Sequence, residues 1–159
     1  MTFVPDDFEV PDGLACDSFR LVPLGAEHNE SDYAAWSASV EHIHATPGFE
    51  QRPWPPREGM PLEQNRAELQ EHADDFAARR GFTYTVLAPD RDEVIGCVYI
   101  YPGGDGAAAV RSWVRASDAA LDRPLYEAVT RWLAERWPFE RVSYAPRSSR
   151  WESPNSCQR

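Results

Sequence analysis

The sequence of 159 residues contains no lysine, because all 16 of its basic residues are arginine. This absence excludes chemistry that depends on lysine, such as a Schiff base or a P-loop that binds phosphate. Acidic residues number 26, the net charge is -10, and nucleic-acid binding needs clustered positive charge. We therefore expect no nucleic-acid partner. An acidic surface tolerates cationic, amine-bearing ligands.

Long apolar runs and cysteines are also scarce. No run reaches the about 18 apolar residues of a membrane span, and the N-terminus lacks the pattern of a signal peptide. Cys16, Cys97 and Cys157 are scattered, so we expect neither a disulfide framework nor a zinc site, with Cys97 buried in an apolar strand. His42 and His44 point to different faces of a helix and do not predict a shared metal. These features predict no membrane, no metal and a reduced, cytoplasmic compartment.

The chain divides by composition into three parts. Residues 1–16 are acidic and lack periodicity, which predicts an extended N-terminal arm. Residues 17–146 carry the periodic apolar patterns of one domain with its own core. Residues 147–159 look like a flexible C-terminal tail.

The first half of the domain predicts one strand and two helices. The strand covers 17–24, and apolar residues at helical spacing predict a helix over 29–44. The following segment, 47–61, is too rich in proline to be regular. A second helix then begins at Leu62 and ends near Gly81.

The second half predicts three consecutive strands, which form an antiparallel meander, then a helix and a final strand. The turn GGDG joins two strands, which favours a hairpin over a phosphate-binding loop. The whole order predicts an α/β fold of the layered α+β kind, with a mostly antiparallel central sheet of about five strands flanked by three helices. The expected bounds are 82–87, 93–101 and 107–116 for the meander, Asp122 for the start of the helix and 141–145 for the last strand.

Three stretches resemble the GNAT superfamily of acyl-CoA-dependent N-acetyltransferases. FTYTVLAPDRDEVIGCVYIYP is similar to its second and third strands, VRSWVRAS to its fourth strand, and RPLYEAVTRWLAERWPFERVSYA to its next helix and fifth strand. The resemblance covers roughly Phe19 to Pro146, and the order of elements carries it more than any single motif. It implies transfer of an acetyl group from acetyl-CoA to a primary amine of a small molecule or peptide.

In that family the fourth and fifth strands splay apart, and the pantetheine arm of acetyl-CoA enters the gap. By position, the resemblance implies that the strand residues Trp113, Val114 and Arg115 bind the cofactor, and that the Val114 N–H polarises the thioester. The next turn binds the pyrophosphate in the family, which implies three further cofactor-binding residues here. They are Ala119, Ala120 and Arg123.

That turn departs from the family pattern Q/R-x-x-G-x-G/A. Ala119 falls at the first position, Asp122 at the first glycine and Pro124 at the final small residue. Proline removes an N–H donor, and acidic residues repel a pyrophosphate. The alternative interpretation is an ordinary helix start that Asp122 caps.

Base and acceptor candidates follow from the implied layout. Tyr99 and Tyr144 lie on strands beside the gap, and Glu41 ends the first helix, so these three are the predicted catalytic residues. Three aromatic residues are predicted to bind the substrate, with the proline-rich segment as a lid: Trp54, Phe49 and Tyr101. The alternative for Trp54 is a clamp that holds its loop to the core.

A second functional interpretation stays open. The glycine-free turn, and a sequence that ends before the family's last helix and final strands, favour a GNAT-like ligand-binding or protein-interaction domain that has lost acetyl-CoA binding. The family often takes its general-acid tyrosine from that missing helix. The open edge of a sheet that ends at its fifth strand predicts a homodimer, unless the N-terminal arm covers the edge.

Overall fold

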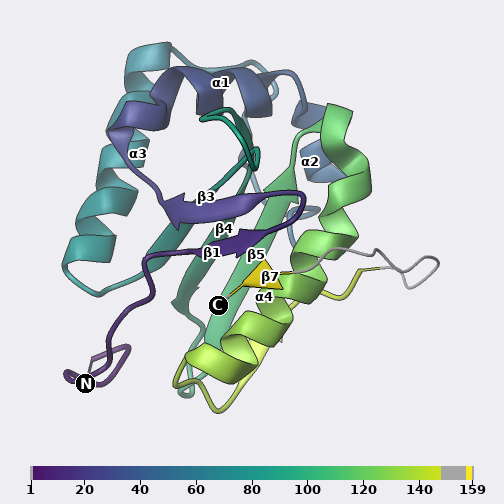
Figure 1. Ribbon diagram of the computed structural model, residues 1–159. Coiled ribbons are helices and arrows are strands. Elements are labelled where there is room, and N and C mark those ends of the chain that lie inside the picture. Colours follow the sequence, from purple (N-terminus) through teal and green to yellow (C-terminus); the bar gives the residue numbers. More distant parts are fainter. Residues whose placement is uncertain (1, 148–156, 159) are drawn as a thin grey trace.

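Seven strands form one sheet, in the order β6-β5-β4-β3-β2-β1-β7, in the computed structural model, which describes residues 2–147 and 157–158 (Figure 1). All neighbouring pairs are antiparallel except β5 and β6, which run parallel. The predicted layered fold is confirmed in kind, and β1 and β7 extend the expected sheet at one edge. The strands are β1 (Leu14–Cys16), β2 (Arg20–Pro23), β3 (Phe82–Leu87), β4 (Val94–Pro102), β5 (Ala108–Val114), β6 (Val142–Tyr144) and β7 (Cys157–Gln158).

The helices cover both faces of the sheet, with α1 and α3 on one side and α4 on the other (Figure 1). Their bounds are α1 (Asn29–Ser37), α2 (Val40–His44), α3 (Leu62–Ala77) and α4 (Asp122–Arg136), with 3-10 turns η1 (Ala26–His28) and η2 (Ala116–Leu121).

The single helix predicted over 29–44 is interrupted between α1 and α2. The Ser39 N–H donates to the Trp36 carbonyl O at 2.9 Å, which closes the end of α1. The Ser39 side chain then accepts the Ala116 N–H at 2.8 Å. The break therefore fixes α2 against the turn that follows β5, a long-range contact that local periodicity does not encode.

Two apolar clusters form the core, one on each face of the sheet. Val114 belongs to the cluster under α4, whereas Trp113 belongs to the cluster under α1 and α3. This difference follows from the alternation of side chains along a strand. As a result, Tyr99, Tyr101 and Arg111 face α3, and these residues line the candidate site described below.

The N-terminal arm packs on the core under α4 along part of its length. Val4 is buried there, and Phe3 stacks on Phe82 and Phe139 with ring centroids 5.9 and 5.0 Å apart. The end of the arm forms β1, which pairs with β2. The arm therefore adds a strand to the sheet beside β2, whereas β6 forms the opposite edge of the described sheet.

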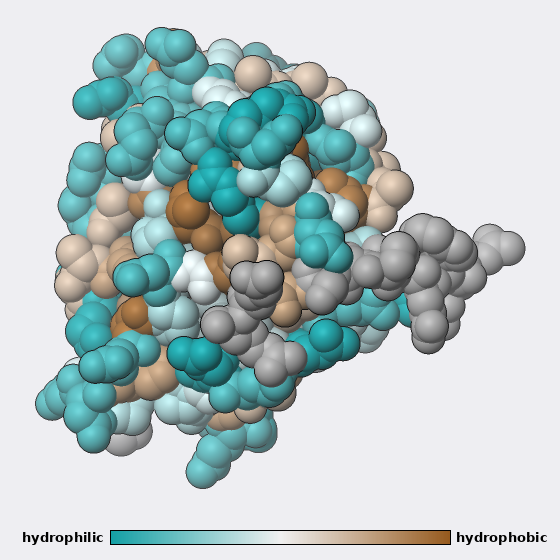
Figure 2. All heavy atoms as spheres, in the orientation of Figure 1, coloured by the Kyte–Doolittle hydropathy of each residue, from teal (hydrophilic) through white to brown (hydrophobic). Residues whose placement is uncertain are grey.

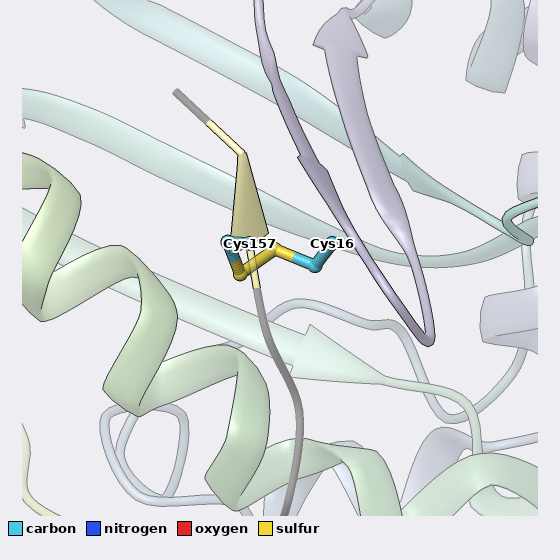
Figure 3. Close-up of a disulfide and its surroundings, with 2 residues drawn as sticks. All are labelled: Cys16 and Cys157. Atoms are coloured by element: carbon cyan, nitrogen blue, oxygen red, sulfur yellow. A yellow bond between two sulfur atoms is a disulfide. The ribbon is translucent and has the colours of Figure 1, made fainter.

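Cys16 and Cys157 form a disulfide with an S–S distance of 2.02 Å (Figure 3). The prediction that the chain holds no disulfide is therefore wrong. The physical reason is the pairing of β1 with β7, which places the two cysteines opposite each other across 141 residues of sequence. Cys97 is free and buried, as predicted. Residues 148–156 and 159 of the predicted flexible tail lie outside the described residues.

The surface is mostly polar on the face that Figure 2 shows, where apolar side chains appear in scattered patches. Among the described residues, no helix combines the length and the apolar character that crossing a bilayer requires.

Candidate functional site

A cavity of about 380 Å³ opens between α1, α3, the loop after α2, and strands β4 and β5. This volume lies within the range of roughly 300 to 1,000 Å³ that is usual for small-molecule sites. The three residues predicted to bind substrate, Phe49, Trp54 and Tyr101, all line it. We call this cavity the pocket.

Trp54 joins the proline-rich loop to the core. Its ring lies 5.8 Å from that of Trp36, 6.1 Å from Phe49 and 5.9 Å from Trp113. His44 fixes the loop further, because its Nε2 lies 2.7 Å from the Pro55 carbonyl O. Trp54 thus clamps the loop, as the alternative interpretation held, and lines the pocket at the same time.

His72, a residue that the sequence did not single out, lies in a hydrogen-bonded chain on one wall of the pocket. The Tyr101 hydroxyl donates to Asp75 Oδ2 at 2.9 Å and lies 2.8 Å from His72 Nδ1. Burial raises the pKa of Tyr101 to about 12, and its single proton goes to the carboxylate. Nδ1 of His72 must therefore be the donor toward Tyr101, and Nε2 carries the lone pair.

Burial makes this histidine a poor cation and a usable base. It lowers the pKa of His72 from 6.5, against the opposing effects of Asp75 and Glu71, while Arg111 lowers it further. The ring is therefore neutral near pH 7. A neutral imidazole that lines a pocket with Nε2 unprotonated can accept a proton from a bound ligand.

Asp32 is a buried carboxyl on the α1 wall of the pocket. Its Oδ2 accepts from Asn65 Nδ2 at 3.1 Å, and Asn65 also donates to Asn29 at 2.8 Å. Burial raises the pKa of Asp32 from 3.8 to about 6, the bond from Asn65 opposes this effect, and Glu68 adds to it. The pocket therefore holds a carboxylate that a cationic group would stabilise.

Arg111 lies on the β5 wall with its Nε buried and without a hydrogen-bond partner among the described residues. Its guanidinium carbon lies 5.8 Å from the ring centroids of both Phe49 and Tyr99. Burial lowers the pKa of Arg111, and the charge of Arg52, which also lines the pocket, lowers it further.

The structure separates the three predicted catalytic residues. Tyr99 lines the pocket, accepts Trp113 Nε1–H at 3.0 Å, and is so buried that its pKa is raised well above 10. Tyr144 lies on β6, with its hydroxyl 2.6 Å from Ser112 Oγ. Glu41 lies on the surface of α2, where it pairs with Arg57 at 3.1 Å. They form no single cluster, and Tyr99 is the member that shares the pocket.

The short strand β6 pairs along its whole length with the first three residues of β5, and β5 continues beyond this pairing. Ala108, Ala109 and Val110 pair with 142–144, and the rest of β5 has no partner on that side among the described strands. The Ala108 N–H donates to the β6 side, and the Arg115 N–H donates to Ile95 on the β4 side. By alternation, Ser112 and Val114 direct their backbone groups into the gap that opens beyond Val110.

Arg147 fills part of this gap. Its side chain is 2 % exposed and donates to the Ser112 carbonyl O at 2.7 Å and to the Ala145 carbonyl O at 2.8 Å. It also pairs with Asp122 at 2.8 Å and lies over the ring of Tyr144 at 5.6 Å. A backbone acceptor of β5 is thus occupied by the chain's own guanidinium.

The turn after β5 does not offer a cradle for a pyrophosphate as it stands. Its N–H groups are used inside the chain: Ala116 donates to Ser39, Asp118 to Arg115 and Asp122 to Ala119. Asp122 is not the predicted helix cap either, because α4 follows η2 directly and the Asp122 carboxylate binds Arg147.

The six predicted cofactor residues have different environments. Trp113 and Val114 are buried on opposite faces of the sheet, and Arg115 is held by ion pairs to Glu93 and Asp118, both at 2.6 Å. Ala119 and Ala120 are exposed in η2. Arg123 pairs with Glu127 at 3.3 Å. Of the three predicted cofactor residues at the end of β5, Val114 is the one whose N–H points toward the gap.

No family model and no curated protein matches this sequence. Solved structures of acetyltransferases do match, among them the following three. A ribosomal-protein-S5-alanine acetyltransferase from Vibrio fischeri has a TM-score of 0.63 at 11% identity, covering 86% of this chain and 72% of that one. RimL, a ribosomal L7/L12 α-N-protein acetyltransferase in complex with coenzyme A, has 0.63 at 14%, covering 80% and 70%. MccE, with acetyl-CoA and AMP, has 0.56 at 11%, covering 75% and 62%.

Proposed function

Because this chain has the fold of the GNAT acetyltransferases, as its resemblance implied, we propose that it is an N-acetyltransferase. The acyl donor is acetyl-CoA, and the acceptor is a primary amine of a small molecule or peptide in the pocket. The observation that carries the proposal is that β6 ends opposite Val110, so the second half of β5, which also supplies Arg111 to the pocket, has no strand partner on that side among the described strands.

The chain's own residues supply binding and proton transfer in this proposal. The pocket holds the amine beside His72, whose Nε2 takes a proton from the ammonium form so that the nitrogen becomes a nucleophile. Acetyl-CoA would supply the thioester: its acyl carbon forms the new C–N bond as the C–S bond breaks, and coenzyme A leaves as the thiol when its sulfur takes the second proton that the nitrogen gives up. The N–H of Val114 is the donor that we assign to the thioester oxygen, because it points into the gap.

The acceptor class has support from the similar structures. The names of the Vibrio fischeri protein and of RimL state that they act on ribosomal proteins. A peptide N-terminus is therefore one acceptor class for this chain, and a small-molecule amine of the size of the pocket is the other.

A second candidate function rests on Arg147 and on the turn after β5. Both use groups that an acyl-CoA would need, so a ligand-binding or protein-interaction domain without acetyl-CoA is the competing proposal. Under the acetyltransferase proposal, Arg147 must leave the gap before the donor enters.

Acetyl-CoA binding separates the two candidates. Thermal unfolding is measured with and without millimolar acetyl-CoA for the wild type, for Arg147→Ala and for Arg141→Ala, an exposed arginine before β6. A ligand that binds only the native state stabilises it by about 2.7 kcal/mol at 100 times its Kd. A rise in the melting temperature, larger in Arg147→Ala than in the wild type or Arg141→Ala, supports the acetyltransferase. No rise in any of the three proteins contradicts it and leaves the second candidate.

One further prediction belongs to this proposal, and one earlier expectation is affected by the disulfide. A homodimer would form through the β6 edge, where Val142 is 40% exposed, and size-exclusion chromatography with light scattering measures it. The Cys16–Cys157 disulfide counts against the expected cytoplasmic location, because reducing compartments disfavour disulfides.

A further inference from the structure

Arg111 is a half-buried cation whose Nε atom is buried, and it has no counter-ion among the described residues. It has no carboxylate within 4 Å among the described residues, although Asp32, Glu68 and Asp75 all line the same pocket. Asp75 is already paired with Arg80 at 3.0 Å. In the part of the chain that the structure describes, the buried Nε of Arg111 also lacks a hydrogen-bond acceptor. A buried guanidinium donor without an acceptor is costly unless a ligand supplies one.

The surroundings of Arg111 hold it in place rather than neutralise it. Phe49 and Tyr99 both lie against its guanidinium, at 5.8 Å. Arg52 lines the same pocket, and its positive charge repels that of Arg111. Two like charges near one cavity repel each other, and an anion bound between them relieves this repulsion. The fork of donors on a guanidinium matches a carboxylate or a phosphate in shape.

The α1 and α3 walls of the pocket favour an amine, in contrast to the anion that Arg111 favours. The His72 ring lies beside the Tyr99 ring, with centroids 5.5 Å apart. Its Nε2 is unprotonated, because its Nδ1 donates to the Tyr101 hydroxyl. Asp32 adds a buried carboxyl. One wall therefore favours an anion, and the facing walls favour an amine.

We propose that the pocket binds a small amine that also carries an anionic group, a carboxylate or a phosphate, with the anion on Arg111 and the amine toward His72. This inference rests on the proposed function for the role of the amine and deepens it by naming the acceptor class. The binding step itself does not require acetyl-CoA, so the two can fail separately.

Matched ligand pairs test the proposal on the full chain without acetyl-CoA. L-Phenylalanine is compared with L-phenylalaninamide, and O-phosphoethanolamine with ethanolamine, by calorimetry or ligand-observed NMR. The two pairs distinguish a carboxylate from a phosphate. We expect at least one anionic member to bind roughly 10- to 100-fold more tightly than its neutral counterpart, the loss typical of one charge-assisted contact.

Variants assign the preference to Arg111. Arg111→Gln should abolish the difference within the pair that shows it, and Arg111→Lys should keep part of it because the charge remains. Arg131→Gln, an exposed arginine of α4 on the other face of the sheet, should change nothing. Thermal unfolding confirms that each variant is folded, and Arg111→Lys carries the test if Arg111→Gln does not fold.

The overturning results are equally concrete. The proposal is wrong if neither anionic ligand binds better than its neutral partner, if no ligand of the panel binds, or if folded Arg111 variants keep the full preference. If the anionic amine binds but receives no acetyl group from acetyl-CoA, the acetyltransferase proposal fails and the assignment of the ligand class stands.

Discussion

Arg147 and Asp122 form an ion pair inside the gap between β5 and β6, with Nε of the arginine 2.8 Å from Oδ2 of the aspartate. The arginine side chain is 2 % exposed and that of the aspartate 20 %. The pair ties the end of β6 to the first turn of α4. Breaking one member of such a pair leaves a buried charge without its partner.

The first prediction follows from this ion pair. Asp122→Asn should lower the free energy of unfolding by about 2 to 4 kcal/mol, because the buried guanidinium of Arg147 loses its counter-charge. The measurement is urea unfolding at pH 7. Asp90→Asn is the control, because Asp90 pairs with Arg91 on the surface and should contribute little. Equal effects of the two substitutions would show that Arg147 is not held by Asp122.

The second prediction concerns the disulfide. Cys16→Ser, Cys157→Ser and the double variant should lose similar stability, since each removes the same cross-link. For a closure of 141 residues, the loop-entropy model gives an upper value of about 5 kcal/mol. A thiol count in denaturant without reductant should give one free thiol, that of Cys97. Three free thiols, or a double variant as stable as the wild type, would contradict the cross-link.

The third prediction concerns the pH dependence that Asp32 imposes. The native pKa of about 6 exceeds the value of 3.8 for an unperturbed carboxyl, so the native state binds more protons than the unfolded state in this window. Stability therefore falls as the pH rises from about 4 to about 6 through this group. Asp32→Asn keeps an oxygen for Asn65 and should remove this fall.

At pH 7 the Asp32→Asn variant should be more stable than the wild type by at most about 3 kcal/mol, from two pKa units at about 1.4 kcal/mol each. Unfolding curves between pH 4 and 7 measure the effect. Glu30→Gln, an exposed change on the same helix, should leave the pH profile unchanged. A wild type whose stability rises across this window relative to Asp32→Asn would refute the assignment.

The fourth prediction concerns the protonation of His72. Nitrogen NMR should show Nδ1 protonated and Nε2 bare at pH 7, with a pKa below 6.5. Asp75→Asn should lower the pKa of His72 further, because the negative charge of Asp75 favours the imidazolium. Asp74→Asn, on the exposed side of α3, is the matched control. If acetyl transfer is found, its acidic limb should move with this pKa.

A result with Nε2 protonated would place the acceptor lone pair on Nδ1 and remove His72 as the base that faces the pocket. A pKa above 6.5 would show that the carboxylate outweighs burial. With either outcome, the hydrogen bond from Tyr101 to Asp75 would only hold α3 against β4.

Local patterns predicted most of the fold because they are strong where the elements are long. The meander from Phe82 to Val114 alternates or runs apolar, and its hairpin at Gly103–Gly106 sets the pairing. The break at Ser39 was not predictable from periodicity, because the Ser39 side chain accepts a hydrogen bond from Ala116, which is 77 residues away. The disulfide depends in the same way on a strand pair that joins the two ends of the chain.

The three aromatic residues that the sequence indicated lie together in the pocket: Phe49, Trp54 and Tyr101. Their role in binding substrate stays a prediction. The hairpin could have indicated Arg111. Counting residues outward from the turn along both strands pairs Arg111 with Tyr99, on the same face of the sheet. His72 gave no such signal. Its role depends on Tyr101 and Asp75, which reach it only after α3 packs on β4.

Successive side chains of β5 point to opposite faces of the sheet. Arg111 lines the pocket, and its neighbour Ser112 accepts a hydrogen bond from Arg147 in the gap. Lengthening or shortening the turn before β5 by one residue would therefore exchange these duties along the whole strand. The loop at Gly103–Gly106 is not part of the lining of the pocket, yet its length decides which side chains of β5 reach the pocket and which reach the gap.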